Sequence, residues 1–284
     1  MNCWRLWIGK MYKNKNVDIF IYGVKAFTPL VTDPVYKVVT NANDSVEKYH
    51  TELPIYRDFD GVDNISDKNL VFNEYTGWYW IWKNMPLKQY VGFNHYRRYF
   101  DFLDDVPDIN KIFQKSRIIL NSKFYMRTDS TPRDNRFFYG YYHNIKDFEL
   151  MESCVKDLYP EYAEGWDKMS KSTHIYPSSI MIMPSSLFSE YMQYIMDVTE
   201  EFCDRIGCHT SEDYIKHVEE HRSEYIKDYN KLFAYYTVEK QARVIGYLIE
   251  RCLCAFLMSG GSNSLENHST QLPWHVFDVK YNEK

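Results

Sequence analysis

YVGFNHYRRYF, residues 90–100, begins as a buried β-strand and then delivers a histidine, two arginines and three more aromatic residues with no turn residue between them. A continuous strand would point His95 and Arg97 to one face and Arg98 to the other, because successive side chains alternate. One arginine is therefore expected to be structural. At least one should bind an anion, because adjacent arginines are costly to bury without a partner. The alternative is an ion-pair network with the acidic run at residues 101–105.

Strand and helix patterns alternate on both sides of this stretch. Further strands are expected at residues 17–22, 36–42, 117–122 and 178–184, and helices at 66–84, 145–159, 161–171, 187–205 and 233–258. This alternation predicts an α/β fold, with a mostly parallel sheet flanked by helices. With no linker or repeat to divide the chain, residues 17–258 are expected to form a single domain.

The two ends of the chain are expected to lie outside that domain. Residues 1–16 read as an N-terminal extension, in which Trp4, Trp7 and nearby lysines allow a peripheral membrane contact. Residues 259–284 read as a tail, partly disordered as far as Trp274. The polar stretch at 207–230 is expected to be a mobile loop or an excursion helix.

Charge and cysteine content exclude several classes of protein. A net charge of -5 and a pI near 6.0 argue against a nucleic-acid-binding protein, which needs a basic surface. The six cysteines are dispersed and lack CxxC spacing, so neither a zinc cage nor a disulfide framework is indicated. A cytoplasmic location, with or without peripheral membrane contact, is the simplest expectation.

Polar residues gather where the helix at 66–84 is expected to start. Ser66 is the expected N-cap, and a helix N-terminus offers free amides to an anion. A cap needs only one such side chain, yet the segment also carries Asp63, Asn64, Lys68 and Asn69. The surplus favours a site for a nucleoside or for sugar hydroxyls over plain capping.

A second polar group lies within an apolar helical pattern. Arg243, Gly246, Tyr247 and Glu250 share one helix face by their three- and four-residue spacing. Glu250 could be a general base whose pKa is set by burial and by Arg243. A buried arginine–glutamate pair that joins two helices explains the pattern equally well.

Several familiar signatures are missing. The sequence has no GxGxxG, Walker loop, HExxH or GxSxG motif, which removes the commonest cofactor-binding, NTPase, zinc-protease and hydrolase classes. No Asp-x-Asp follows a hydrophobic strand to hold a divalent metal, and residues 101–105 are the nearest substitute. No cofactor is therefore assigned, while Mn²⁺ or Mg²⁺ stays open.

Five segments, DNISDKN, YWIWKN, YVGFNHYRRYF, YPEY and QARVIGYLIER, resemble in order and spacing a glycosyltransferase family of bacteria and viruses. This family comprises capsular and exopolysaccharide biosynthesis proteins and was first catalogued as a domain of unknown function. The similarity spans about residues 17–258 and is most specific over 63–100. It implies a single Rossmann-like domain resembling the GT-A glycosyltransferase fold, and sugar transfer from a nucleotide-activated donor, with some relatives regarded as galactofuranosyltransferases.

The resemblance also implies a site. Its donor region would comprise Lys25, Asp63, Asn64, Ser66, Lys68, Asn69, His95, Arg97 and Arg98. The acceptor side would lie near His143 and Ser179, with Arg243 and Tyr247 on the helix beyond. The sequence departs from the family pattern at Gly23–Lys25, where Thr-His-Lys is usual, and at Ser179–Met181, so acceptor identity does not transfer.

These observations lead to one main hypothesis. The chain would be a hexosyltransferase that moves a sugar from a nucleotide-diphosphate donor, UDP-hexose or UDP-galactofuranose, to a glycan or lipid-linked acceptor. Arg97 or Arg98 would offset the charge on the leaving diphosphate, and His95 and Glu250 would be the catalytic residues. The alternatives are a non-catalytic carbohydrate- or nucleotide-binding protein on the same fold and, less favoured by the charge, an RNA-binding protein.

Overall fold

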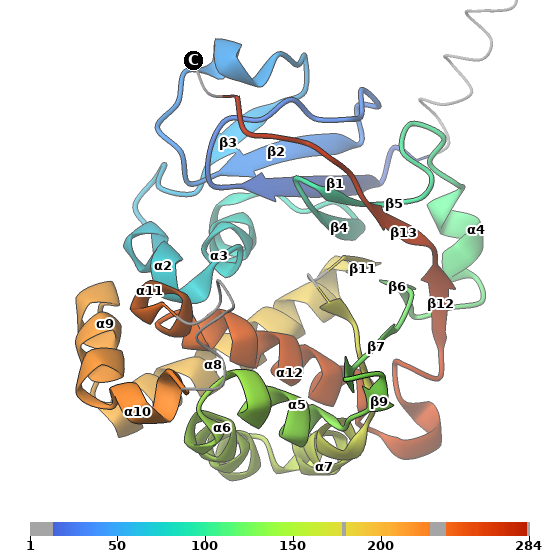
Figure 1. The fold of residues 1–284 in the computed structure, drawn as a ribbon. Helices are drawn as coiled ribbons and strands as arrows, with labels where there is room; N and C mark the ends of the chain where they lie inside the picture. Colours follow the sequence, from blue (N-terminus) through green and yellow to red (C-terminus); the bar gives the residue numbers. More distant parts are fainter. Residues whose placement is uncertain (1–13, 178–179, 228–236, 283–284) are drawn as a thin grey trace, which may run out of the picture.

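The computed structural model describes residues 14–177, 180–227 and 237–282 (Figure 1). Its centre is a mixed sheet in the order β12-β6-β11-β4-β1-β2-β3. These strands are β1 (Val17–Gly23), β2 (Tyr36–Thr40), β3 (Ile55–Arg57), β4 (Tyr90–His95), β6 (Ile118–Asn121), β11 (Met181–Pro184) and β12 (Ser269–Leu272). Four of the six pairings along this path are parallel, which confirms the predicted α/β class with a mostly parallel sheet.

The central strand β1 is buried along its whole length, as its run of apolar residues predicts. Strand β11 is the exception to the parallel pattern, because it runs antiparallel to both β4 and β6. Beyond β4, the short strand β5 (Arg98–Phe100) pairs with β4 and with β13 (Trp274–Val276). The core strands thus come from both ends of the chain.

Helices form a thick layer on one face of the sheet (Figure 1). They are α2 (Asn69–Phe72), α3 (Tyr75–Asn84), α5 (Asn135–Tyr142), α6 (Ile145–Leu158), α7 (Ala163–Lys171), α8 (Ser185–Ile206), α9 (Ser211–Glu220), α10 (Arg222–Tyr225), α11 (Val238–Gln241) and α12 (Val244–Met258). The other face is covered by loops, by α4 (Ile109–Phe113) and by the C-terminal residues.

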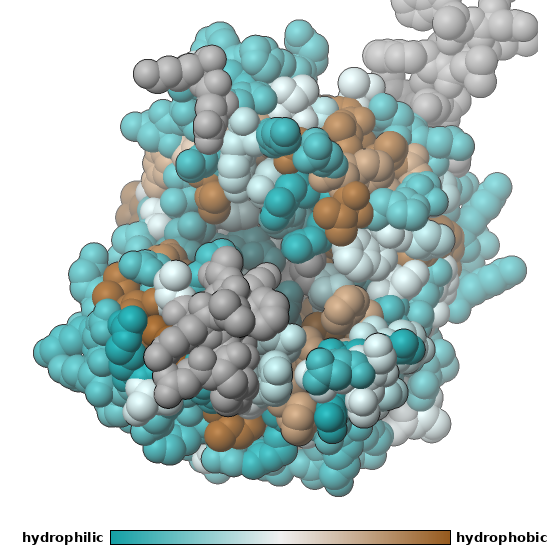
Figure 2. All heavy atoms as spheres, in the orientation of Figure 1, coloured by the Kyte–Doolittle hydropathy of each residue, from teal (hydrophilic) through white to brown (hydrophobic). Residues whose placement is uncertain are grey.

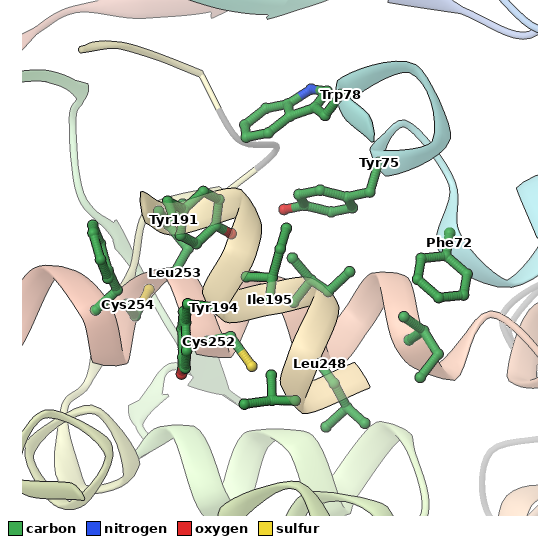
Figure 3. Packing of buried hydrophobic residues seen from close by; sticks show 14 of the residues in the cluster. Phe72, Tyr75, Trp78, Tyr191, Tyr194, Ile195, Leu248, Cys252, Leu253 and Cys254 are labelled. Atoms are coloured by element: carbon green, nitrogen blue, oxygen red, sulfur yellow. The ribbon is translucent and has the colours of Figure 1, made fainter. Parts of the chain in front are cut away.

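The main core lies between the sheet and α12. Tyr191, Tyr194 and Ile195 of α8 pack among α12 side chains such as Leu248, while Tyr75 and Trp78 approach from α3 (Figure 3). The Trp78 ring stacks on Phe93 of β4 with 3.8 Å between ring centroids. Helix α12 is almost entirely buried, which gives the polar groups at its N-terminal half a fixed support.

Two predicted helices are interrupted. The helix expected at 66–84 begins as a 3₁₀ turn, Ser66–Lys68, and breaks at Asn73, whose φ of 56° belongs to the left-handed region. Ser66 makes no capping bond, so its assignment as the N-cap is wrong. The helix expected at 233–258 is divided into α11 and α12, and residues 233–236 lie outside the described part of the chain.

The stretch at residues 90–100 is not one continuous strand. The chain turns at Tyr96 and Arg97, and β5 returns antiparallel to β4 with His95 opposite Arg98. The alternation expected from a continuous strand is therefore wrong. Both arginines reach the same side of the molecule.

The tail also differs from expectation, since β12 lies within the part expected to be disordered and pairs with β6, and β13 begins at Trp274 and pairs with β5. The polar stretch after residue 207 was expected to be either a mobile loop or a helix, and it forms the helices α9 and α10. The N-terminal extension, including Trp4 and Trp7, lies outside the described residues up to position 13. Among the described helices, none combines the length and apolarity needed to span a bilayer.

Helix α12 depends on close contact with α7 at Gly165. A Cβ atom there would lie 2.1 Å from the carbonyl oxygen of Ala255. We expect Gly165→Ala to lower the free energy of unfolding by about 2 kcal/mol, since overpacking costs about 3 kcal/mol and alanine's helix propensity returns about 1. Urea titration measures this, with exposed Glu164→Ala as control. A Gly165→Ala protein as stable as wild type would contradict the close packing.

Candidate functional site

A cavity of about 610 Å³ opens where β1 and β4 end. The chain leaves β1 toward β2 on one side and later returns to β4 on the other, so these neighbouring strands mark the point where the strand order reverses. Open α/β sheets bind ligands in the crevice outside the carboxyl ends of the strands at such a point. The surface is hollowed between the strand layer and the helices, with hydrophilic residues in the depth of the hollow and some hydrophobic ones at its edge (Figure 2).

One wall of the cavity is basic. Arg97, Arg98, Lys240 and Arg243 all line it. Arg97 lies in the turn after β4 and Arg98 begins β5, while Lys240 lies in α11 and Arg243 directly precedes α12. The Arg97 guanidinium lies 5.0 Å from the centre of the Tyr96 ring, which supports it from behind. Guanidinium groups gathered in this way suit an anion with several oxygens.

Asn73 links this wall to the helices. Its side-chain oxygen accepts a hydrogen bond from Arg243 Nε at 2.5 Å, and its carbonyl accepts one from Asn69 Nδ2 at 2.8 Å. Gly246 permits the contact, because a Cβ there would come within 1.7 Å of the Asn73 amide nitrogen. The left-handed conformation of Asn73 is thus held by bonds that also aim Arg243.

A buried polar network stands behind the cavity. Asn69 Nδ2 donates to the Tyr22 hydroxyl at 2.6 Å, and Tyr22 and Thr76 both bond to Oδ2 of Asp58. Asp58 is fully buried, and this burial raises the pKa of its carboxyl despite those bonds. Because its members come from β1, α2 and α3, the network fixes the end of β1 against the helix pair.

His95 is held as a neutral imidazole. Burial, Arg98 and Arg97 together lower its pKa to about 3. The backbone amide of Arg97 donates to Nδ1 at 3.2 Å, which leaves the proton on Nε2. His95 therefore offers a neutral hydrogen-bond donor to the cavity.

Two carboxylates face the basic wall. Glu250 extends from α12 and pairs with the buried Arg251, whose Nη1 lies 3.3 Å from Oε2. Glu74 lies at the start of α3, and its pKa is raised by burial and by the charge of Glu250. Arg243, which the sequence offered as the partner of Glu250, bonds to Asn73.

The cavity brings together many of the residues that the sequence indicated. The predicted residues that line it are Asn69, His95, Arg97, Arg98, Arg243, Tyr247 and Glu250. Those described but outside the lining are Lys25, Asp63, Asn64, Ser66, Lys68 and His143, and Ser179 falls in the undescribed pair 178–179. Their roles in the donor or acceptor region remain predictions.

The residues outside the lining have other contacts. Asp63 accepts a hydrogen bond from the Tyr79 hydroxyl at 2.7 Å, and Ser66 Oγ donates to Asn64 at 2.8 Å. His143 is only 8% exposed and stacks on Tyr247 with ring centroids 4.2 Å apart. It therefore supports the cavity wall from behind.

Sequence reasoning missed several lining residues, namely Tyr22, Asn73, Glu74, Lys240 and Tyr281. Asn73 and Glu74 fall inside a stretch that was predicted to be one continuous helix. The prediction therefore did not include the break at Asn73, which places both residues at the cavity. Tyr281 belongs to the tail, far from the motifs. An asparagine followed by a glutamate within an apolar helical pattern was the one available signal.

The acidic run at residues 101–105 lies elsewhere. Asp104 accepts hydrogen bonds from the backbone amides of Thr32 and Asp33, and Asp101 lies 3.3 Å from His275. Within the described ranges, no three His, Cys, Asp or Glu side chains gather closely enough to hold a metal ion. Dependence on Mn²⁺ or Mg²⁺ stays a prediction.

Comparison with known proteins gives a family and a fold. Residues 19–236 match the family described as a domain of unknown function, DUF4422. No curated protein matches. The apo structure of the WbbM bifunctional glycosyltransferase superposes with a TM-score of 0.68 at 21% identity, over 94% of this chain and 46% of that one. This chain thus spans about half of WbbM, and the likeness establishes a shared GT-A-like fold.

The mannosyltransferase Ktr4p from S. cerevisiae is a more distant likeness. It superposes with a TM-score of 0.36 at 10% identity, over 68% of this chain and 62% of Ktr4p. A similarity at this level adds nothing to the assignment of the fold.

The state of His95 can be tested by pH titration. Since burial and the neighbouring arginines lower its pKa to about 3, we expect it to stay neutral from pH 5 to 8. Nitrogen NMR of the imidazole, assigned with His95→Gln, should show an unprotonated Nδ1 throughout that range. A midpoint near the ordinary value of 6.5 would contradict this environment. The imidazole of exposed His209, which lies outside the cavity, serves as the comparison in the same sample.

Proposed function

The chain belongs to the DUF4422 family, and we propose that it is a glycosyltransferase that uses a nucleotide-diphosphate sugar. The observation that carries the proposal is one cavity at the reversal of the strand order, with arginines on one wall and two carboxylates facing them. A hexose from UDP-hexose or UDP-galactofuranose would pass to a glycan or lipid-linked acceptor. The similarity to half of a bifunctional glycosyltransferase supports the reaction class.

The basic wall supports an anionic donor. A nucleoside diphosphate leaves with additional negative charge on its terminal phosphate, and fixed cations stabilise that charge as it develops. Arg98 and Arg243 are half-buried, while Arg97 is exposed. The neutral His95 would add a hydrogen bond from Nε2 to a phosphate or sugar oxygen.

The carboxylates support proton removal from the acceptor. Glu250 would take the proton of the acceptor hydroxyl as its oxygen bonds to the anomeric carbon, while the bond from that carbon to the diphosphate oxygen breaks. Arg251 Nη1 bonds to Oε2 of Glu250, which holds this carboxylate at the cavity wall. Glu74 shares the cavity and is the second candidate for this proton.

Arg98 should be needed to bind the donor. We expect UDP or another nucleoside diphosphate, at a hundred times its dissociation constant, to stabilise the wild-type protein by about 2.7 kcal/mol. Arg98→Ala should weaken binding by tenfold or more, because a charge-assisted contact is lost. Calorimetry with UDP, GDP, CMP and dTDP, with manganese or with EDTA, measures both.

Exposed Arg127→Ala, which removes the same charge outside the cavity, is the matched control. Equal affinity in Arg98→Ala and wild type would rule out the basic wall as the diphosphate site. Failure of every nucleotide to bind would favour a carbohydrate-binding protein without turnover.

Glu250 should be needed for turnover and not for donor binding. Glu250→Gln keeps the shape and removes the base, so we expect the transfer rate to fall by about 10² to 10⁴ while donor affinity changes less than about twofold. Glu74→Gln is the matched comparison in the same cavity. Full activity in Glu250→Gln together with loss in Glu74→Gln would show that Glu74 is the base. Full activity in both variants would show that neither carboxylate is the base.

A further inference from the structure

The last described residues of the chain form a strap over the cavity turn. We define the C-terminal strap as residues 274–282, which begin with β13 (Figure 1). In β13, Val276 lies opposite Arg98 in an antiparallel pairing with β5. The next residue, Phe277, donates its amide proton to the carbonyl of Arg97 at 2.7 Å. The strap therefore holds the backbone of both arginines.

The far end of the strap is anchored beside the end of β1. Asn282 donates from its backbone amide to the Ala26 carbonyl at 2.7 Å and from Nδ2 to Thr28 Oγ1 at 3.0 Å. Tyr281 forms an isolated β-bridge with Phe27. The strap thus joins β5 to the segment that follows β1, the two sides of the cavity entrance.

Between these anchors, Tyr281 packs on the turn itself. Its ring stacks on Tyr96 with 4.4 Å between centroids and 20° between planes. Tyr96 in turn lies 4.4 Å from His95 and carries the Arg97 guanidinium at 5.0 Å. Tyr281 also lines the cavity directly. One aromatic ring therefore supports the residue that touches both His95 and Arg97.

We propose that the C-terminal strap is a working part of the donor site, and that Tyr281 is a positioning residue which holds the turn from His95 to Arg98 in the geometry that binds a diphosphate. The inference rests on the proposed function and deepens it. Arginine side chains lose much conformational freedom when they bind, so a turn fixed beforehand lowers that cost. The strap lies beyond residue 236, where the match to the family ends.

Two full-length variants separate stacking from the hydroxyl group. We expect Tyr281→Ala to raise the dissociation constant of the nucleoside diphosphate by tenfold or more, and Tyr281→Phe, which keeps the ring, to change it less than about threefold. Tyr125→Ala, at a residue 57% exposed and outside the cavity, is the matched control. Equal affinity in Tyr281→Ala and wild type would overturn the proposal.

A double-mutant cycle tests whether Tyr281 acts through the arginines. If it positions Arg97 and Arg98, Tyr281→Ala should cost less than about twofold in affinity once both arginines are alanine. Full additivity would instead mean direct contact with the ligand and would overturn the positioning role.

Amide hydrogen exchange, measured without ligand, tests the role of the strap independently of nucleotide binding and of activity. Amides of residues 95–98 and of Phe277 should exchange faster in Tyr281→Ala than in Tyr281→Phe, with helix α12 unchanged. If exchange accelerates in this way but wild type binds no nucleotide, the proposed function fails and the strap's role in holding the turn stands. If exchange at the turn is unchanged, the strap inference fails whatever nucleotide binding shows.

Discussion

The parallel pairing of β1 with β4 determines where every part of the cavity can lie. Their register places Tyr22 opposite His95, and the Tyr96 amide continues the ladder by donating to the Tyr22 carbonyl at 3.0 Å. Both strands therefore end at the same level, and the chain turns away from each. The turn with the two arginines follows directly from this ending, and the helices and the strap are arranged around it.

The helices supply the opposing charges because two of them are interrupted. The break at Asn73 separates α2 from α3 and turns Glu74 toward the cavity, and the break before α12 frees Arg243 to bond to Asn73. In a single continuous helix at either place, these side chains would point in different directions around the helix axis and would not gather at the cavity. The close approach at Gly246 joins the two breaks, so the basic and acidic walls are positioned by one shared contact.

Local sequence pattern was enough to predict the α/β class, the buried β1 and the helix face that carries Gly246, Tyr247 and Glu250. It was not enough for features that depend on distant contacts. The turn at Tyr96 contains no glycine or proline that would indicate a turn in the sequence. It is stabilised by Phe277 and Tyr281, near the other end of the chain. The polar residues at 63–66 bond to one another and to Tyr79 outside the cavity lining, and their role in donor binding stays a prediction.

The central claim is that the arginine wall binds the diphosphate of a sugar donor. The most direct measurement is a crystal structure of the chain with a bound nucleoside diphosphate. The account predicts phosphate oxygens within hydrogen-bond distance of Arg98 and Arg243, with Glu250 on the opposite side of an open space large enough for a sugar. A diphosphate bound away from these arginines, or against the loop at residues 63–66, would contradict it.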